Sequence, residues 1–222
     1  MRGRFITFEG GEGAGKSSHA ALLAQRLRGL GLGVVLTREP GGSPGAEIIR
    51  HVLLSGAAKP LGPSAEAILF AAARDDHVRS TIEPALAAGR WVICDRFTDS
   101  TRVYQGTLGH VDEAMIHALE RVTVGDLRPD LTFVMDVPAE VGFARAKKRR
   151  GDSEADRFES EGLEFHRQLR DGFLQVGVSN PNRCVLIDAQ SPKAEVAERI
   201  WDVVRKRLDP ALAPVALAEA AS

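Results

Sequence analysis

The chain has 222 residues, of which 44% are hydrophobic and 27% are charged, and its formal net charge is −1. These proportions are typical of a globular protein and exclude a disordered, collagen-like or disulfide-scaffold chain. A protein that binds duplex DNA usually carries a basic excess, so the near-zero net charge predicts no nucleic-acid partner.

Neither a signal peptide nor a membrane-spanning segment is predicted, because Glu9 and Glu12 interrupt the apolar stretch near the N-terminus and no run of about 18 apolar residues occurs. Cys94 and Cys184 lie in short apolar runs, where we expect buried thiols, and two cysteines are too few for a four-ligand zinc site. The six histidines show no metal-ligand spacing and are interpreted as surface or helix residues. We expect a cytoplasmic protein without a membrane partner.

Apolar and amphipathic segments alternate along the chain. Five short apolar segments are predicted as strands: residues 5–8, 34–36, 91–94, 131–137 and 184–187. The predicted helices cover residues 16–28, 46–54, 64–77 with Ser64 as the cap, 84–89, 112–122, 139–149, 158–176 and 193–208. Continuous apolar strands are typical of a parallel sheet with helices on both faces, so we expect a three-layer α/β/α fold with a five-stranded parallel sheet.

We expect a single domain over residues 1–208. Residues 209–222 are rich in Pro and Ala and carry neither a helical periodicity nor a cap. This composition predicts a disordered C-terminal tail.

A glycine-rich motif follows the first predicted strand. Residues 10–17, Gly-Gly-Glu-Gly-Ala-Gly-Lys-Ser, fit the phosphate-binding pattern G-x-x-x-x-G-K-[ST] between a strand and a helix. In such a loop the backbone N–H groups point at phosphate oxygens, and the helix N-terminus adds a partial positive charge. Lys16 would reach the β- and γ-phosphates and Ser17 would ligate Mg²⁺. The motif therefore predicts a P-loop that binds a nucleoside triphosphate.

The strand predicted over residues 91–94 ends in Asp95 and Arg96, at the edge where parallel sheets bind ligands. Asp95 can hold Mg²⁺ through water and Arg96 can hold a phosphate, and the alternative for this pair is a salt bridge at the strand end. A GTPase would carry an Asn-Lys-x-Asp tetrapeptide, which is absent from the sequence. A mechanical ATPase would end this strand in adjacent acids.

Six segments together resemble the bacterial thymidylate kinase family. They are residues 8–17, residues 37–42 (Thr-Arg-Glu-Pro-Gly-Gly), residues 70–74 (Phe-Ala-Ala-Ala-Arg), residues 95–106 with Asp-Arg, Ser100 and Tyr-Gln-Gly, residues 128–131 (Arg-Pro-Asp-Leu) and residues 156–159 (Asp-Arg-Phe-Glu). The resemblance covers about residues 4–208. It implies a P-loop, nucleoside monophosphate kinase-like fold with a mobile lid at about residues 145–157 and a homodimer. The implied reaction transfers the γ-phosphate of ATP to dTMP with Mg²⁺ and without a general base.

The resemblance also implies roles for individual residues. The expected ATP-binding residues are Gly10, Gly11, Glu12, Gly13, Ala14, Gly15, Lys16, Ser17 and Ser18. The expected metal ligands are Ser17 and Asp95. The expected dTMP-binding residues are Glu12, Arg38, Phe70, Arg74, Arg96, Ser100, Tyr104 and Gln105. The expected catalytic residues are Lys16, Arg96, Arg149, Arg150 and Arg157.

The implied contacts divide dTMP into phosphate, sugar and base. Arg38 and Arg96 would clamp the acceptor phosphate, and Glu12 would accept a hydrogen bond from the 3′-hydroxyl. Phe70 and Arg74 are four residues apart on one helix face, so the ring could stack on the pyrimidine while the arginine contacts its edge. Ser100, Tyr104 and Gln105 would line the base and deoxyribose, where a tyrosine ring under the sugar would exclude a 2′-hydroxyl.

The variable positions of the P-loop carry no arginine. In family members of that kind the lid carries the arginine of the transition state, so we expect this role for Arg149, with Arg150 and Arg157 as alternatives. The other interpretation of the basic run at 145–150 is a solvated helix end, where the helix dipole favours cations.

Two other functions stay open. One is a P-loop kinase for a different nucleoside monophosphate, against which Phe70, Arg74 and Tyr104 argue. The other is a P-loop binding module that switches a partner by nucleotide state. Such a switch has no use for a second phosphate clamp formed by Arg38 and Arg96.

Overall fold

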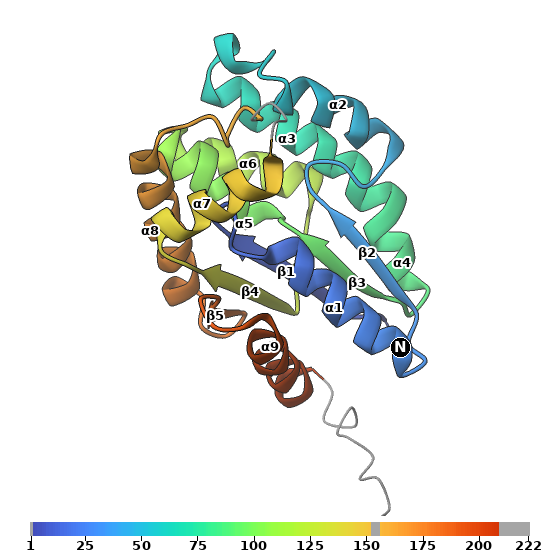
Figure 1. Ribbon diagram of the computed structural model, residues 1–222. Coiled ribbons are helices and arrows are strands. Elements are labelled where there is room, and N and C mark those ends of the chain that lie inside the picture. Colours follow the sequence, from blue (N-terminus) through green and yellow to red (C-terminus); the bar gives the residue numbers. More distant parts are fainter. Residues whose placement is uncertain (1, 152–155, 209–222) are drawn as a thin grey trace, which may run out of the picture.

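The computed structural model describes residues 2–151 and 156–208, so the predicted tail and the centre of the predicted lid loop lie outside the described residues. Five parallel strands form one sheet in the order β2-β3-β1-β4-β5 (Figure 1). The strands are β1 (Phe5–Gly10), β2 (Val34–Arg38), β3 (Trp91–Asp95), β4 (Leu131–Asp136) and β5 (Cys184–Asp188). This arrangement confirms the predicted five-stranded parallel sheet.

Helices cover both faces of the sheet. The described helices are α1 (Lys16–Gly29), α2 (Pro44–Leu54), α3 (Pro63–His77), α4 (Glu83–Ala87), α5 (Thr98–Thr101), α6 (Glu113–Thr123), α7 (Ala139–Arg150), α8 (Leu163–Ser179) and α9 (Lys193–Arg207). Three shorter helical segments are η1 (Lys59–Leu61), η2 (Val78–Ile82) and η3 (Arg102–Leu108). None of the helices within residues 2–151 and 156–208 is both long enough and apolar enough to cross a membrane.

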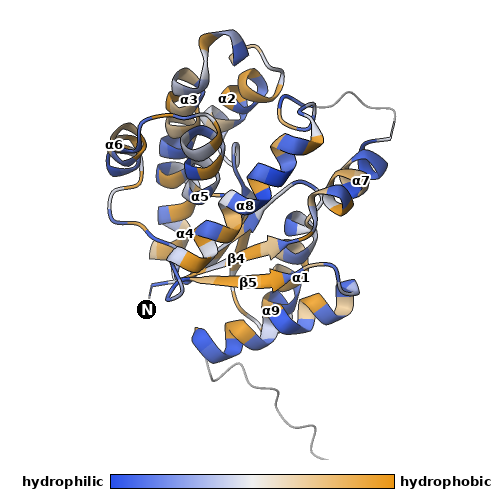
Figure 2. Cartoon of the chain, turned by 90° about the vertical axis from the view of Figure 1, so that its left-hand side faces the viewer, coloured by the Kyte–Doolittle hydropathy of each residue, from blue (hydrophilic) through white to orange (hydrophobic). Residues whose placement is uncertain are grey.

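The core forms two layers around β1, whose six residues are all buried. On one face, α1 and α9 pack on the sheet around Phe8 and Phe133, and on the other face α4 and α8 pack around Phe5 and Val134. Figure 2 shows β4 and β5 as hydrophobic strands between helices whose outer sides are hydrophilic. Cys94 and Cys184 are buried free thiols, as predicted. Burial of strands on both faces explains their continuous apolar sequence.

Strand order positions the ligand edge of the sheet. The chain leaves β1 in the centre, reaches β2 at one edge, returns to β3 beside β1, and then crosses to β4 on the other side. In an open parallel sheet, the crevice for ligands forms at the carboxyl ends where the order reverses, here beside β1. The P-loop and the pair Asp95 and Arg96 both lie at that edge.

Two local predictions were wrong, and one helical region was not predicted. The helix predicted from residue 158 begins at Leu163, because the Asp156 carboxylate accepts the N–H groups of Phe158 and Glu159, both at 2.9 Å, and holds a turn there. Helix α3 begins at Pro63 after Gly62, so Ser64 is not its cap; proline is favoured at the first helical position because its missing N–H would have no partner there. Residues 98–108, for which no element was predicted, form α5 and η3.

Candidate active site

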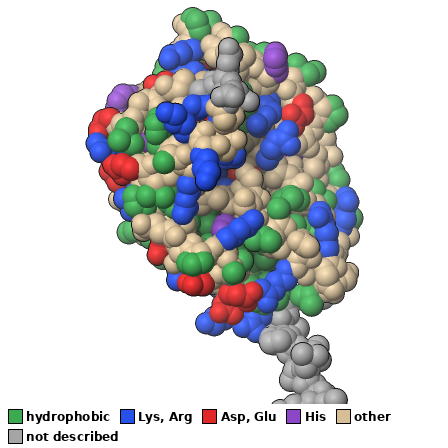
Figure 3. All heavy atoms as spheres, viewed as in Figure 1, with side chains coloured by type: hydrophobic (Ala, Val, Ile, Leu, Met, Phe, Trp, Pro, Cys, Tyr) green, Lys and Arg blue, Asp and Glu red, His purple; other side chains and the backbone are tan. Residues whose placement is uncertain are grey.

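The carboxyl edge of the sheet opens into a cleft of about 340 Å³. Its lining includes most of the residues predicted from the sequence: Glu12, Gly13, Gly15, Lys16, Ser17, Ser18, Arg38, Phe70, Arg74, Asp95, Arg96, Ser100, Tyr104, Gln105 and Arg149. Figure 3 shows Lys and Arg side chains gathered on this face of the molecule. The near-zero net charge of the chain therefore conceals a local concentration of cations suited to anionic ligands.

The P-loop connects the end of β1 to the start of α1. Gly10, Gly13 and Gly15 have φ values of 131°, 69° and 88°, a region that disfavours residues with a side chain. A Cβ at Gly13 would lie 2.1 Å from the carbonyl oxygen of Gly142, so the loop also packs directly against α7. Glycine is thus required here both for the curl of the backbone and for the close approach of α7, the helix that leads into the predicted lid.

Lys16 and Ser17 begin α1, directly after the loop. The Lys16 ammonium donates a 2.7 Å hydrogen bond to the carbonyl of Gly11, which keeps the side chain folded over the loop. Burial lowers the pKa of Lys16, and the nearby positive charge of Arg96 acts in the same direction. A bound phosphate would supply the negative charge that this buried ammonium needs.

Ser17 and Asp95 bring two oxygen donors together at the foot of the P-loop. The Ser17 hydroxyl donates to one carboxylate oxygen of Asp95. The other oxygen, Oδ1, is buried and has no hydrogen-bond partner among the described residues. A carboxylate oxygen without a partner beside a hydroxyl, both next to a phosphate loop, fits Mg²⁺, which takes one or two protein oxygens together with phosphates and water.

Arg96 follows β3 in a left-handed backbone conformation, with φ of 71°. Its guanidinium pairs with the Glu12 carboxylate and donates to the carbonyl of Gly10 at 3.1 Å and to Ser100 Oγ at 3.2 Å. The Tyr104 hydroxyl donates to the same Glu12 carboxylate at 3.1 Å. Burial acts to raise the pKa of Glu12, but the charges of Arg96 and Lys16 and the hydrogen bond from Tyr104 together outweigh it, and the pKa falls to about 2. Glu12 is therefore ionised and can accept hydrogen bonds.

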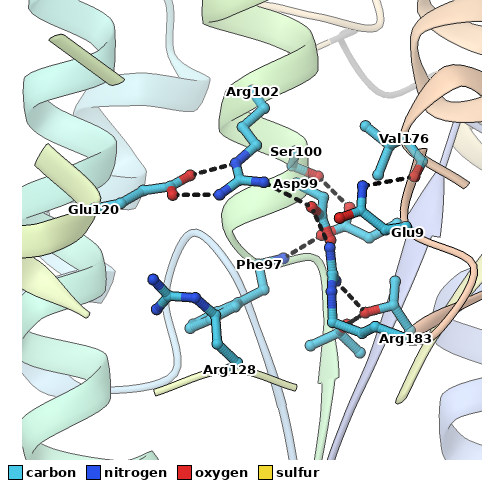
Figure 4. Close-up of polar contacts among 12 residues, drawn as sticks. Glu9, Phe97, Asp99, Ser100, Arg102, Glu120, Arg128, Val176 and Arg183 are labelled. Carbon is cyan, nitrogen blue, oxygen red and sulfur yellow. Dashed lines mark hydrogen bonds and ion pairs between the residues drawn. The ribbon is translucent and has the colours of Figure 1, made fainter. Parts of the chain in front are cut away.

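Glu9, on β1, lies under the turn that carries Arg96 and is fully buried. Its carboxylate accepts hydrogen bonds from the backbone N–H of Phe97 at 2.7 Å and from the hydroxyl of Ser100 at 2.6 Å (Figure 4). Burial, together with the negative charge of Asp99, raises the pKa of Glu9 to about 8. Because Ser100 also accepts from Arg96, Glu9 connects the central strand to the guanidinium in the cleft.

A second set of ion pairs holds α5 from behind. Arg183 donates to both carboxylate oxygens of Asp99, at 2.6 and 3.0 Å, and to Thr132 on β4 at 2.7 Å (Figure 4). Arg102 binds both oxygens of Glu120 on α6, at 2.7 and 2.6 Å. The segment after Arg96 is therefore tied to the sheet on one side and to α6 on the other. Paired arginine–carboxylate bonds of this kind resist rotation as well as separation.

Phe70 and Arg74 lie one turn apart on α3 and both line the cleft. Phe70 is half-buried, with its ring centroid 6.1 Å from that of Phe158. Only 3% of the Arg74 side chain is exposed, and it donates to Glu39 at 2.7 Å. The predicted pairing of these two residues on one helix face is confirmed.

The remaining arginines lie at the rim of the cleft or outside it. Arg38 and Arg149 line the cleft with side chains 54% and 61% exposed. Arg38 pairs with Glu47 at 3.0 Å and Arg149 pairs with Glu159 at 2.7 Å. Arg150 and Arg157 are absent from the cleft lining. Arg150 reaches Glu159 at 3.4 Å, whereas Arg157 donates to Glu66 at 3.2 Å.

A family model described as thymidylate kinase matches residues 8–200. The thymidylate kinase of Afipia carboxidovorans is 61% identical over 211 residues, which are 95% of this chain and 92% of that protein. The thymidylate kinase of Rhodopseudomonas palustris (strain BisB18) is 62% identical over 208 residues, 93% of this chain and 90% of that protein. The chain belongs to the thymidylate kinase family.

The fold agrees with this family. The crystal structure of thymidylate kinase from Ehrlichia chaffeensis superposes with a TM-score of 0.74 at 33% identity, covering 92% of this chain and all of the other. The resemblance inferred from the six short segments is confirmed, and with it the P-loop, nucleoside monophosphate kinase-like fold.

Sequence reasoning missed four residues that support the site of this family member. They are Glu9, Glu39, His77 and Arg183. Glu9 and Glu39 lie within two of the segments that carried the family resemblance, but no role was predicted for them. An acid at an otherwise apolar strand end is a signal that could have identified Glu9. His77 and Arg183 are far from the motifs in sequence, and no local pattern marks them.

Proposed function

We propose that the P-loop end of the cleft binds ATP and that the end formed by Phe70, Arg74 and Tyr104 binds dTMP. The chain is a dTMP kinase, which transfers the γ-phosphate of ATP to dTMP. One observation supports separate ATP and dTMP sites within the cleft. The same cleft is lined by a P-loop and by a second group of arginines beside an aromatic ring.

At the donor end, the backbone N–H groups of residues 10–18 would bind the phosphates of ATP. Lys16 would pair with the β- and γ-phosphates, replacing its hydrogen bond to Gly11. Mg²⁺ held by Ser17 and Asp95 would neutralise charge on the phosphate oxygens. The unpartnered oxygen of Asp95 supports this assignment.

At the acceptor end, Arg96 and Arg38 would hold the phosphate of dTMP. A planar guanidinium can meet two phosphate oxygens at once, which suits a clamp. The acceptor oxygen is already anionic near neutral pH, so no proton has to be removed and no general base is needed. Catalysis then consists of positioning and charge neutralisation, as in phosphoryl transfer generally.

The sugar and base of dTMP would lie between α3 and η3. Glu12, ionised through its contact with Arg96, would accept a hydrogen bond from the 3′-hydroxyl. Phe70 would stack on the pyrimidine and Arg74 would donate to its edge. Tyr104 would lie under the sugar, where its ring leaves no room for a 2′-hydroxyl.

For the transition state we propose Arg149. It is the one of the three lid candidates that lines the cleft among the described residues, whereas Arg150 and Arg157 are absent from the lining and pair with Glu159 and Glu66. To reach the γ-phosphate, Arg149 would leave Glu159, an exchange that an exposed ion pair permits at small cost.

An acceptor panel tests the proposal. ADP release is measured with Mg-ATP and each of dTMP, dUMP, dGMP and CMP, and without an acceptor. We expect strong stimulation by dTMP and little by dGMP or CMP. Turnover with dGMP or CMP but not dTMP would favour a kinase for another monophosphate. ATP binding without acceptor-dependent turnover would favour a nucleotide switch.

We also propose a homodimer formed through α2, α3 and α6. Exposed apolar side chains gather on these packed helices: Ile48, Val52, Ile68 and Val122. Light scattering should give a dimer for the wild-type chain and a monomer for the double variant Ile48→Glu with Ile68→Glu. Val178→Glu, at an exposed apolar position on α8, is the control that should leave the dimer intact.

The cytoplasm is the proposed location. Cys94 and Cys184 are free thiols, which is typical of a reducing compartment. Cell fractionation followed by detection of the protein would test this, and recovery in an oxidising compartment would contradict it.

A further inference from the structure

Behind Arg74 lies a chain of three polar side chains, two of them buried and one half-buried, to which no motif assigned a role. Glu39 accepts the Nε–H of Arg74 at 2.7 Å through one oxygen and contacts His77 Nδ1 at 3.1 Å through the other. The second ring nitrogen of His77, Nε2, lies 2.7 Å from the hydroxyl of Thr37. His77 is fully buried, and Arg74 and Glu39 are almost so. The three residues behind Arg74, namely Glu39, His77 and Thr37, are called the relay below.

The chemistry of the donors defines how the relay is protonated. An ionised carboxylate only accepts hydrogen bonds, so the Nδ1 of His77 carries a proton toward Glu39. In a neutral imidazole the other nitrogen is then an acceptor, which matches the hydroxyl of Thr37 as donor. In this state both ring nitrogens of His77 and both carboxylate oxygens of Glu39 have a hydrogen-bond partner. The negative charge of Glu39 faces the positive charge of Arg74. Buried polar groups that are fully satisfied in this way rigidify their surroundings.

The remaining contacts of Arg74 leave one nitrogen free for a ligand. NH2 donates to the carbonyl of Phe97 at 3.2 Å and to the hydroxyl of Thr101 at 3.0 Å, and Nε donates to Glu39. Among the contacts of the described residues, NH1 has no partner, and Arg74 belongs to the cleft lining. These three hydrogen bonds fix the plane of the guanidinium group. Because one of them goes to Glu39, the direction in which the NH1 hydrogens point depends on the relay.

The relay is closed off by the loop after β2. A Cβ at Gly42 would lie 2.3 Å from the Thr37 hydroxyl and 2.5 Å from His77 Nε2, so backbone covers this contact directly. Arg38, the last residue of β2, and Pro40, in this loop, both line the cleft. His77 therefore joins the arginine on α3 to the segment that faces the acceptor phosphate.

We propose that His77 is a positioning residue for pyrimidine recognition: it holds the Glu39 carboxylate, which in turn aims the NH1 of Arg74 at the edge of the base. This inference rests on the proposed function, in which Arg74 contacts the base of dTMP. His77 itself does not line the cleft and is not a catalytic residue.

The first test compares two substitutions at one position. His77→Leu removes the donor to Glu39, whereas the side-chain amide of His77→Asn can replace the Nδ1 donor. For His77→Leu we expect the KM for dTMP to rise about tenfold, the loss that goes with one misdirected charged hydrogen bond, with kcat and the KM for ATP within about twofold. His77→Asn should restore most of the affinity for dTMP. An unchanged KM for dTMP in His77→Leu would overturn the proposal.

A packing control separates positioning from general destabilisation. Val78 is the buried neighbour of His77 and packs in an apolar cluster with Phe5, Ile82 and Leu86. Val78→Ala should lower the Tm at least as much as His77→Leu but leave the KM for dTMP unchanged. If Val78→Ala raises that KM equally, the effect of His77 is merely structural and the proposal fails.

A ligand without a base gives the sharpest readout. 2-Deoxyribose 5-phosphate keeps the phosphate and sugar of dTMP, so its inhibition constant against dTMP reports only those contacts. His77→Leu should weaken dTMP binding and leave this inhibition constant unchanged. Equal weakening of both ligands would show that the relay acts on the phosphate end, and would overturn a role in base recognition.

A double-mutant cycle separates failure of the relay from failure of the proposed function. If His77 acts through Arg74, the variant combining Arg74→Lys with His77→Leu should bind dTMP no more weakly than Arg74→Lys alone. Additive losses would overturn the relay while leaving the role of Arg74 intact. An Arg74→Lys variant with wild-type affinity for dTMP would overturn both the base contact and the relay.

Discussion

The buried and the exposed arginines of the cleft differ in how many partners hold them. Arg74 and Arg96, at the floor, donate to carbonyl, hydroxyl and carboxylate groups on several elements. Arg38 and Arg149, at the rim, each pair with one carboxylate on a neighbouring segment. The floor arginines are therefore pre-oriented before a nucleotide binds, whereas the rim arginines have to exchange a carboxylate for a phosphate. A pre-oriented donor loses less entropy on binding, and an exposed one can move with the lid.

Replacing a floor arginine should have the largest effect. In Arg96→Ala the acceptor phosphate loses two donors, so we expect kcat/KM for dTMP to fall by about 10³-fold or more. The half-buried Glu12 also loses its ion-pair partner, which should cost about 1–3 kcal/mol of stability. Steady-state kinetics, thermal unfolding and ATP binding are the measurements, with ATP binding retained. A variant with near wild-type turnover would contradict the clamp.

Replacing a rim arginine should affect the rate without affecting stability. For Arg149→Ala we expect kcat to fall by about 10²-fold, the effect of removing one donor to the developing charge. The Tm should not change, because an exposed pair with Glu159 contributes about 0–1 kcal/mol. Arg157→Ala is the comparison, and a larger loss of kcat there would transfer the role to Arg157.

Arg38 and Arg96 are proposed to bind the same phosphate of dTMP, but Arg38 lies at the rim of the cleft, so this pair tests the effect of position directly. Arg38→Ala should raise the KM for dTMP by about tenfold, the value of one charged hydrogen bond, and leave the Tm unchanged. Initial rates at varied concentrations of dTMP measure this KM. A loss as large as that of Arg96→Ala would show that burial does not decide the contribution.

Glu9 offers an effect on stability that depends on pH. Its pKa is raised by burial from 4.5 to about 8, so between these pH values the folded chain holds a proton that the unfolded chain releases. The free energy of unfolding contributed by this group therefore falls as pH rises through that window. Glu9→Gln removes the titration, so the Tm of the variant should rise relative to the wild-type Tm by roughly 10 °C as the pH increases across the window. A difference in Tm that is constant with pH would contradict the raised pKa.

Much of the site was predictable because its residues lie in short contiguous motifs. Lys16 and Ser17 belong to a loop whose glycines have a local steric reason, and Phe70 and Arg74 share a face through helical spacing alone. Asp95 ends, and Arg96 follows, a strand that its apolar run identifies. The segment at 98–108 was not predictable, since its buried polar residues satisfy their hydrogen bonds with distant partners and therefore show no apolar periodicity.

The sequence by itself determined the alternation of strands and helices, the parallel sheet and the phosphate loop, because these follow from local periodicity and from backbone conformations that glycine permits. Only the tertiary structure decided which arginines are held and by what. Glu39 and His77 are 38 residues apart, and Asp99 and Arg183 are 84 apart, yet each pair meets in the folded chain. Such contacts depend on the order of the strands and the packing of helices across the sheet, which no local pattern contains.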